Sequence, residues 1–159
     1  MGIMELSIHN KNQVYDRVRN LWVSATPEEI VRQHLLKKMI DELFYPKELI
    51  VVEKSLSEFS LFSSGPTPLR RIDIACFAKN IHPDHSLYPL LLIECKESER
   101  DAMKAFDQVK GYNLFVRAYF VAVSYPKGEL FGFLERGEFR LLDYLPSYTQ
   151  LIQAISHEH

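Results

Sequence analysis

The chain has 159 residues, of which 47% are hydrophobic and 25% are charged, so it is long enough to bury one substantial core. Its 19 Lys and Arg residues and 21 Asp and Glu residues give a net charge of -2. This balance argues against a protein that holds nucleic acid through bulk positive charge, and any polyanionic partner must meet a local basic patch.

The cysteines and the apolar runs indicate a cytoplasmic protein. Cys76 and Cys95 both fall in strand-like apolar runs without the short spacing of a zinc or redox motif, so we expect reduced core thiols. No apolar run approaches the roughly 18 residues of a membrane span, and no signal-peptide pattern opens the chain. The motif G-x-x-x-x-G-K-[ST] does not occur, so we expect no ATP site and no membrane association.

The first elements are a lead-in segment and a helix. Residues 1–24 are mixed and polar, and we expect short strands there, followed by a single domain over 25–159. Thr26 is a suitable N-cap, Pro27 suits the first helical position, and the apolar residues that follow keep a helical period. The pattern predicts a helix that extends to about Phe44.

The rest of the chain alternates strands with one further helix. Runs rich in Val, Ile and Leu predict strands over 48–59, 70–78 and 90–96. The last of these runs is apolar enough for the middle of a sheet that is covered on both faces. We further predict a helix over 101–118, a strand over 119–126 and a hairpin over 128–143. This order predicts an α/β fold with a mixed central sheet, flanking helices and extra hairpin strands.

Charged residues interrupt two of the apolar strands. Strand alternation places Glu94 and Lys96 on one face, and Asp73 lies in the preceding strand, where antiparallel pairing can bring it close to Glu94. Two carboxylates in a partly dry site repel each other unless a cation lies between them. Oxygen-only ligation suits Mg²⁺ or Mn²⁺, and Lys96 can orient or deprotonate an attacking water and neutralise charge in the transition state. The pattern therefore indicates hydrolysis of phosphodiesters.

Each of these residues also has an ordinary structural interpretation. Asp73 could pair with a neighbouring arginine, and Glu94 with Lys96 could form a solvated ion pair of little consequence. Burying charged side chains between apolar neighbours costs free energy, and a sequence without a functional need would avoid it. We therefore favour the interpretation of these residues as a catalytic site. The loop His82 to His85, with the sequence HPDH, is more typical of a solvated turn than of a metal site.

Asp73 and Glu94-Cys95-Lys96 resemble the D...(D/E)-x-K signature of the PD-(D/E)xK nuclease superfamily, with Ile72 where proline is common. The segments "TPEEIVRQHLLKKMIDELFYPKELIVVEKSL", "RRIDIACFA", "LLLIECK" and "AFDQVKGYN" follow the order and spacing of the N-terminal nuclease domain of type I restriction enzyme R subunits. This resemblance extends from about Ala25 to Tyr125. It includes a Q-x-x-x-Y element, Gln108 and Tyr112, that is also found in RecB-like nucleases, although the same spacing suits the boundary of an amphipathic helix.

The resemblance implies a metal-dependent DNA endonuclease of the restriction-endonuclease type. It implies that Asp73, Glu94 and the backbone carbonyl of Cys95 hold Mg²⁺ or Mn²⁺, and that Lys96 is the catalytic lysine. It adds three further catalytic residues: Gln108, Tyr112 and a helix-one glutamate, which is Glu29 or alternatively Glu28. A capping box with Thr26 explains Glu29 equally well. We expect DNA contacts from Arg32, Arg71, Lys104 and Lys110.

The resemblance also suggests partners. A full R subunit carries ATP-driven translocase domains, which we do not find in this chain, so we expect a stand-alone relative, a fragment, or a subunit that relies on partners. The expected partners are DNA and motor or specificity subunits. We also expect a homodimer, because cutting both strands needs two sites. The alternative from another class is a non-catalytic DNA-binding or assembly module of the same fold, and an RNA-directed nuclease is a third interpretation.

Overall fold

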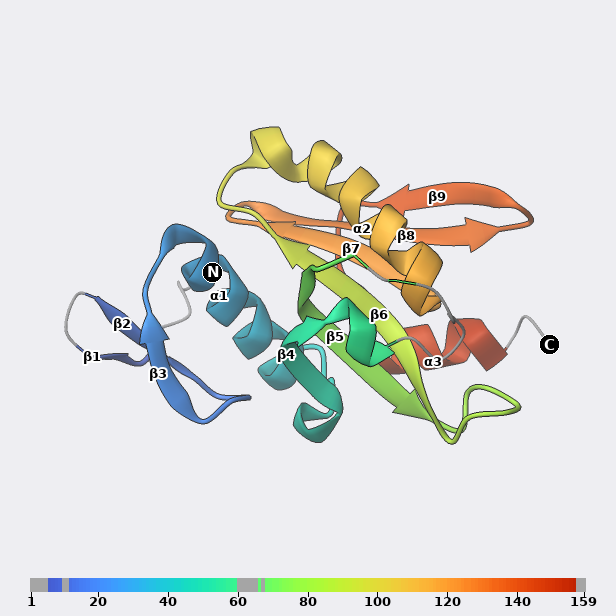
Figure 1. Cartoon of the computed structure of the whole chain (residues 1–159), viewed down its shortest axis with the longest axis horizontal. Helices are drawn as coiled ribbons and strands as arrows, with labels where there is room; N and C mark the ends of the chain where they lie inside the picture. The colour runs from blue at the N-terminus through green and yellow to red at the C-terminus, as the bar shows by residue number, and fades with distance from the viewer. Residues whose placement is uncertain (1–5, 10–11, 60–65, 67, 157–159) are drawn as a thin grey trace.

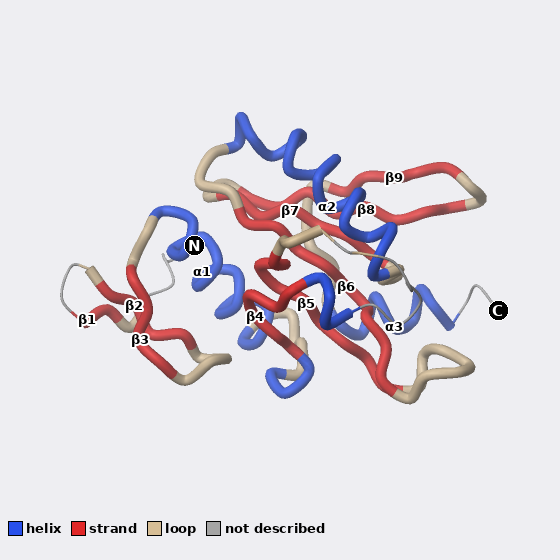
Figure 2. The backbone as a smooth tube through the Cα atoms, in the orientation of Figure 1, coloured by secondary structure: helices blue, strands red, loops and turns tan. Residues whose placement is uncertain are grey.

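The main element of the fold is a six-stranded mixed sheet (Figures 1 and 2). The computed structural model describes residues 6–9, 12–59, 66 and 68–156. Strands β6 and β7 pair in parallel, and the other neighbours pair antiparallel, in the order β4-β5-β6-β7-β8-β9. The strands are β4 (Ile50–Ser55), β5 (Arg71–Lys79), β6 (Leu87–Cys95), β7 (Phe120–Tyr125), β8 (Gly128–Glu135) and β9 (Glu138–Leu142).

Helices cover both faces of this sheet. The α-helices are α1 (Pro27–Asp41), α2 (Ala102–Val116) and α3 (Tyr148–Ser156), and the 3-10 turns are η1 (Lys47–Leu49), η2 (Leu56–Phe59) and η3 (Glu99–Asp101). Leu36 of α1 and Leu151 of α3 share one hydrophobic cluster with Ile93, whereas Phe106 of α2 shares the other with Leu92. Strand β6 is therefore buried on both faces, and the predicted α/β fold is confirmed.

A small antiparallel sheet lies beside α1 at the N-terminal side of the molecule (Figure 1). Its strands are β1 (Ile8–His9), β2 (Gln13–Asp16) and β3 (Leu21–Ser24). Arg17 forms an ion pair of 3.0 Å with Asp41, and buried Asp16 accepts a hydrogen bond of 2.9 Å from Gln33. Side chains of the expected lead-in segment thus bind the middle and the C-terminal end of α1.

Helix α1 begins where predicted and ends earlier than predicted. The Thr26 hydroxyl accepts a hydrogen bond of 3.2 Å from the backbone N–H of Glu29. The helix ends at Asp41 because the N–H groups of Glu42 and Leu43 both bond to the carbonyl of Lys38 and Phe44 adopts a left-handed φ of 57°.

Three other segments differ from or fall outside the sequence predictions. The strand expected over 48–59 is shorter, since β4 ends at Ser55 and η2 follows. The break expected at 63–68 lies mostly outside the described residues. Helix α3 was not predicted, although its sequence contains an N-terminal capping box. The backbone N–H of Ser147 donates to Gln150 Oε1 at 2.8 Å, and the backbone N–H of Gln150 donates to the Ser147 hydroxyl at 3.2 Å. The predicted β8–β9 hairpin is confirmed, with positive φ at Arg136 and Gly137.

None of the helices in the described part of the chain is long and apolar enough to span a membrane.

Gly132 of β8 is a position where alanine should destabilise the fold. A Cβ atom there would overlap the rings of Phe106 and Phe139. We expect Gly132→Ala to lower the free energy of unfolding by about 1–3 kcal/mol, the usual effect of overpacking, in urea denaturation. Gly111→Ala is the control, because its Cβ would meet nothing within 4 Å. In a helix interior this change should raise stability by roughly 0.5–1 kcal/mol. Equal stabilities of the two variants would contradict the proposed packing.

Candidate active site

Asp73 and Glu94 lie side by side on neighbouring strands. Antiparallel pairing of β5 with β6 sets Ile74 opposite Ile93. The next pair in this register is Asp73 with Glu94. Asp73 Oδ2 also accepts a hydrogen bond of 2.8 Å from the backbone N–H of Cys95. The structure thus brings together the two carboxylates that the sequence pattern identified.

Glu94 is a buried carboxylate with one unpartnered oxygen. Glu94 is 6% exposed, and its Oε1 atom has no hydrogen-bond partner. Burial, and then the neighbouring Asp73 charge, raise the pKa of Glu94 to about 9, although Lys96 opposes the shift. Without a further cation, Glu94 is therefore protonated at neutral pH.

This shifted pKa predicts an unusual pH dependence of stability in EDTA. Between the ordinary carboxyl pKa and about 9, the folded protein holds a proton that the unfolded chain has released, so the free energy of unfolding falls as pH rises. Glu94→Gln removes this group. We expect the variant to gain stability over the wild type from about pH 5 to pH 9, by at most about 1.4 kcal/mol per pH unit. Parallel stability curves in urea denaturation would show that the Glu94 pKa is unshifted.

Lys96 follows directly on β6 and lies near Glu94. Its backbone N–H donates a hydrogen bond of 2.8 Å to the carbonyl of Ser124, which continues the β6–β7 pairing. Its positive charge acts on the pKa of Glu94 against the effects of burial and Asp73, so the ammonium group lies close to that carboxylate. With Lys104 and Gln108, Lys96 lines a cavity of about 480 Å³. The site therefore has a cation beside its carboxylates and an open space next to that cation.

Gln108 and Tyr112 form a hydrogen-bonded pair on α2. Gln108 Nε2 lies 2.6 Å from the Tyr112 hydroxyl oxygen and donates to it. Burial, and then the Glu94 charge, raise the pKa of Tyr112. Tyr112 is thus within electrostatic reach of Glu94, and its hydroxyl proton is left to donate to another group.

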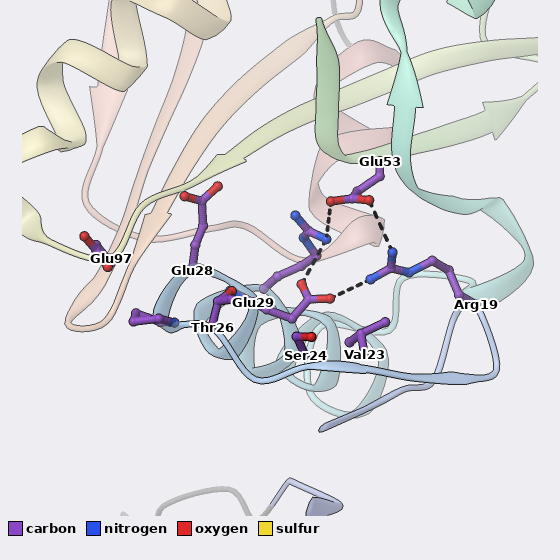
Figure 3. A pocket seen from close by; sticks show the side chains of 10 residues that line it. Arg19, Val23, Ser24, Thr26, Glu28, Glu29, Glu53 and Glu97 are labelled. Carbon is purple, nitrogen blue, oxygen red and sulfur yellow. Dashed lines mark hydrogen bonds and ion pairs between the residues drawn. The ribbon is translucent and has the colours of Figure 1, made fainter. Parts of the chain in front are cut away.

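The two helix-one glutamates have different surroundings, and Figure 3 shows them pointing in different directions. Glu29 lies between two arginines, 2.6 Å from Arg19 and 2.9 Å from Arg32. Burial, and then the Asp73 charge, raise the pKa of Glu28, whereas Lys96 opposes this shift. Of the two alternatives, Glu28 is therefore the one whose pKa responds to the Asp73 and Lys96 charges, and Glu29 belongs to an ion-pair network with Arg19, Arg32 and Glu53.

Arg32 connects this network to Asp73. Its Nη2 atom lies 3.1 Å from Asp73 Oδ1, and its Nη1 atom lies 2.9 Å from Glu29 Oε2 and 3.2 Å from Glu53 Oε1. The Arg32 residue is 5% exposed, so three carboxylates surround one buried guanidinium. This environment differs from that of the exposed phosphate contact expected for Arg32.

Arg19 and Glu53 are components that the sequence analysis missed. Arg19 Nε contacts buried Asp16 at 2.7 Å, and Nη1 reaches Glu53 at 3.4 Å (Figure 3). Glu53 interrupts the apolar run of β4, the same signal that identified Asp73, so it was open to prediction. No sequence pattern points to Arg19. A cavity of about 540 Å³ is lined by the N-terminal end of α1 and by the four residues of this ion-pair network, Arg19, Glu29, Arg32 and Glu53.

The other predicted DNA contacts are spread over the surface. The Arg71 side chain is 72% exposed and lies 4.0 Å from Glu53. Lys104 is exposed and lines the cavity beside Lys96. Lys110 is exposed on α2, and its ammonium group lies 4.3 Å from the centre of the Phe139 ring. Lys104 is therefore the member of this set that shares a cavity with Lys96.

The donor set at Asp73 and Glu94 fits a hard divalent cation. Among the described residues, no group of three or more His, Cys, Asp or Glu side chains is arranged as a metal site, and this includes the HPDH loop. Mg²⁺, however, commonly keeps several waters and uses one or two carboxylates together with substrate phosphates. The unpartnered Oε1 of Glu94 beside the Asp73 carboxylate matches that requirement.

Comparison with solved structures identifies the class of fold. The chain is similar to a fragment assigned to the HsdR subunit of a type I restriction enzyme from Vibrio vulnificus YJ016, with a TM-score of 0.56 and 16% sequence identity. The match covers 84% of this chain and 25% of that chain, so this chain spans about a quarter of the relative. The architecture is thus an HsdR-like α/β fold.

Comparison with protein families identifies the family itself. Residues 27–146 match the family described as type I restriction enzyme R protein N terminus (HSDR_N). The chain therefore belongs to this family, and the resemblance noted from the sequence is confirmed. No curated protein gives a match. The family match begins after the small N-terminal sheet, so Arg19 lies outside it.

Proposed function

We propose that this domain is the nuclease of a type I restriction system and hydrolyses DNA phosphodiester bonds with Mg²⁺ or Mn²⁺. The observation that supports the proposal is a buried, unpartnered Glu94 oxygen beside Asp73, with Lys96 directly after the C-terminal end of β6. This donor set suits a hard cation that binds phosphate oxygens.

Each residue has a role in the proposed reaction. Asp73, Glu94 and the backbone carbonyl of Cys95 would hold the metal, with Glu28 as an additional carboxylate whose pKa the Asp73 charge affects. When bound, the metal supplies positive charge to the phosphate and makes a water more acidic. Lys96 orients the attacking water and neutralises charge that develops on the phosphate oxygens.

The residues of α2 would position the substrate. The Tyr112 hydroxyl, held by Gln108, donates to a phosphate oxygen. Lys104 contacts a second phosphate in the cavity that it shares with Lys96. Exposed Arg71 and Lys110 extend the basic surface to neighbouring phosphates. Sequence specificity, in this proposal, comes from another subunit of the restriction system.

The proposal includes a cellular context. DNA is the substrate, motor and specificity subunits are the partners, and a second copy of the domain would cut the opposite strand. We place the reaction in the cytoplasm, where Cys76 and Cys95 are stable as the free, buried thiols of this fold.

A cleavage assay tests the proposal. Purified protein is incubated with supercoiled plasmid, single-stranded DNA or RNA in Mg²⁺, Mn²⁺ or EDTA, and Glu94→Gln is assayed beside it. We expect metal-dependent cleavage of DNA that the variant lacks. Folded wild-type protein that binds DNA and cuts no substrate would favour the non-catalytic module, and cleavage confined to RNA would change the substrate class.

A further inference from the structure

Arg32 forms an ion pair with Asp73, one of the two carboxylates of the proposed metal site. Its Nη2 atom binds Asp73 Oδ1, while Asp73 Oδ2 accepts from the backbone N–H of Cys95. Both oxygens of Asp73 are thus engaged, whereas Glu94 Oε1 has no hydrogen-bond partner. The two carboxylates of the site are therefore unequal: Asp73 forms an ion pair of 3.1 Å with Arg32, whereas Glu94 has only the nearby Lys96 charge and no ion pair among the described residues.

A divalent cation between these carboxylates would have to share Asp73 with Arg32. Burial acts to lower the pKa of Arg32, but the Asp73 and Glu29 charges outweigh it and the pKa is raised, so the guanidinium stays charged. Two positive groups at this carboxylate, which is 13% exposed, repel more strongly than they would in water. Binding of the metal thus favours a position of Arg32 away from Asp73.

The structure offers Arg32 that second position. Its Nη1 atom already contacts Glu29 and Glu53, and its Nε atom has no partner. Arg19 binds both of these carboxylates from the far side and keeps them in place. A guanidinium carries five N–H donors, so it can turn toward these two acceptors without losing its compensation.

The backbone of β4 directs Glu53 toward Arg32. Strand pairing matches Val52 with Ile74 and Lys54 with Ile72 in one continuous register, so Glu53 lies opposite Asp73, at a position where the pairing is interrupted. Its φ of 54° is left-handed, which is unfavourable for a residue with a side chain and persists only where the surroundings fix it. The interrupted pairing leaves Glu53 beside Asp73, and its carboxylate lies 3.2 Å from Arg32 Nη1.

We infer that Arg32 is the resident counter-cation of Asp73 and that a divalent cation binds by displacing the Arg32 guanidinium onto Glu29 and Glu53. The inference rests on the proposed function for the identity of the cation site. It makes Arg32 a positioning residue, which keeps Asp73 in place before the metal arrives and sets how tightly the metal binds.

Direct Mn²⁺ binding, measured by electron paramagnetic resonance, tests this exchange. We expect Arg32→Gln to bind Mn²⁺ about tenfold more tightly than the wild type, because one charged hydrogen bond no longer has to be broken. The same variant should melt at a lower temperature in EDTA. Lys54→Gln is the charge-matched control, since its ammonium group lies over the rings of Phe59 and Phe77, and it should leave Mn²⁺ affinity unchanged.

Other outcomes overturn the inference in distinguishable ways. A merely structural role would lower both the Mn²⁺ affinity and the melting temperature of Arg32→Gln, which would overturn the exchange and leave the proposed function intact. Absence of Mn²⁺ binding in both proteins would overturn the exchange and the proposed metal site together. Binding in Arg32→Gln alone would show that Arg32 blocks the site and is not displaced, which would overturn the exchange and leave the proposed metal site intact.

A measurement on the wild type avoids any effect of the substitution on folding. The Nε–H resonance of Arg32 should be resolved in a ¹H–¹⁵N spectrum, because this group is buried and without a partner. We expect it to shift on titration with diamagnetic Mg²⁺. The Arg17 signal, from an ion pair with Asp41, should stay unchanged. Saturation with Mg²⁺ without any shift of the Arg32 signal would overturn the inference.

Discussion

Lys96→Met should lower the rate of DNA cleavage by about 10³-fold, since removal of one preorganised charge from a reacting centre has effects of this size. Methionine keeps much of the aliphatic stem of the half-buried lysine and removes the ammonium group. The rate constant is measured under single-turnover conditions with Mg²⁺, and Mn²⁺ binding is measured in parallel. We expect metal binding to survive, because Lys96 is not a ligand in this account.

Two controls separate the role of Lys96 from general charge effects. Lys104→Ala should weaken DNA binding and reduce its salt dependence, with a smaller effect on the rate of the bound complex. Lys127→Ala, at an exposed position in the turn between β7 and β8, should change neither quantity. A rate for Lys96→Met within tenfold of the wild type would remove Lys96 from the chemistry.

Asp73→Asn should strongly weaken metal binding and abolish cleavage. Asparagine retains an acceptor for the backbone N–H of Cys95, but it removes one of the two charges that hold the cation. We expect the Mn²⁺ affinity to fall by on the order of 100-fold, at the upper end of the effects known for residues that only support metal ligands. Isothermal titration calorimetry measures this loss.

The same substitution has a second, independent effect. The Asp73 charge contributes to the raised pKa of Glu94, so Asp73→Asn should reduce the fall in stability between about pH 5 and pH 9. Asp107→Asn, on the exposed side of α2, is the matched control and should leave both properties as in the wild type. Mn²⁺ affinity that is unchanged by Asp73→Asn would move the cation site elsewhere.

Much of the fold was predictable because its signals are local. The capping residues of α1, the apolar run of β6 and the turn at Arg136-Gly137 each depend on a few adjacent residues, and each is found where predicted. The end of α1 and the whole of α3 were not predicted. Apolar residues continue to Phe44 beyond the true end of α1, and the capping box at Ser147 is a short signal near the end of the chain.

The carboxylates of the candidate site were predictable for a different reason. Asp73 and Glu94 stand out as charges within apolar strands, and their pairing follows from the order of β5 and β6. The surroundings of Arg32 were not predictable in this way. Its partners Glu53 and Asp73 come from two further strands, and Glu53 has a left-handed backbone conformation that no sequence pattern indicates. Helical spacing alone could not distinguish such a buried ion pair from a surface contact.

The most direct test of the account is anomalous diffraction at the manganese edge from crystals of the wild-type protein grown with MnCl₂. We predict one strong anomalous peak coordinated by the carboxylates of Asp73 and Glu94 and the backbone carbonyl of Cys95, with the Arg32 guanidinium displaced toward Glu53. A fully occupied Mn²⁺ at another position, or no peak at a saturating concentration, would contradict the assignment of this site.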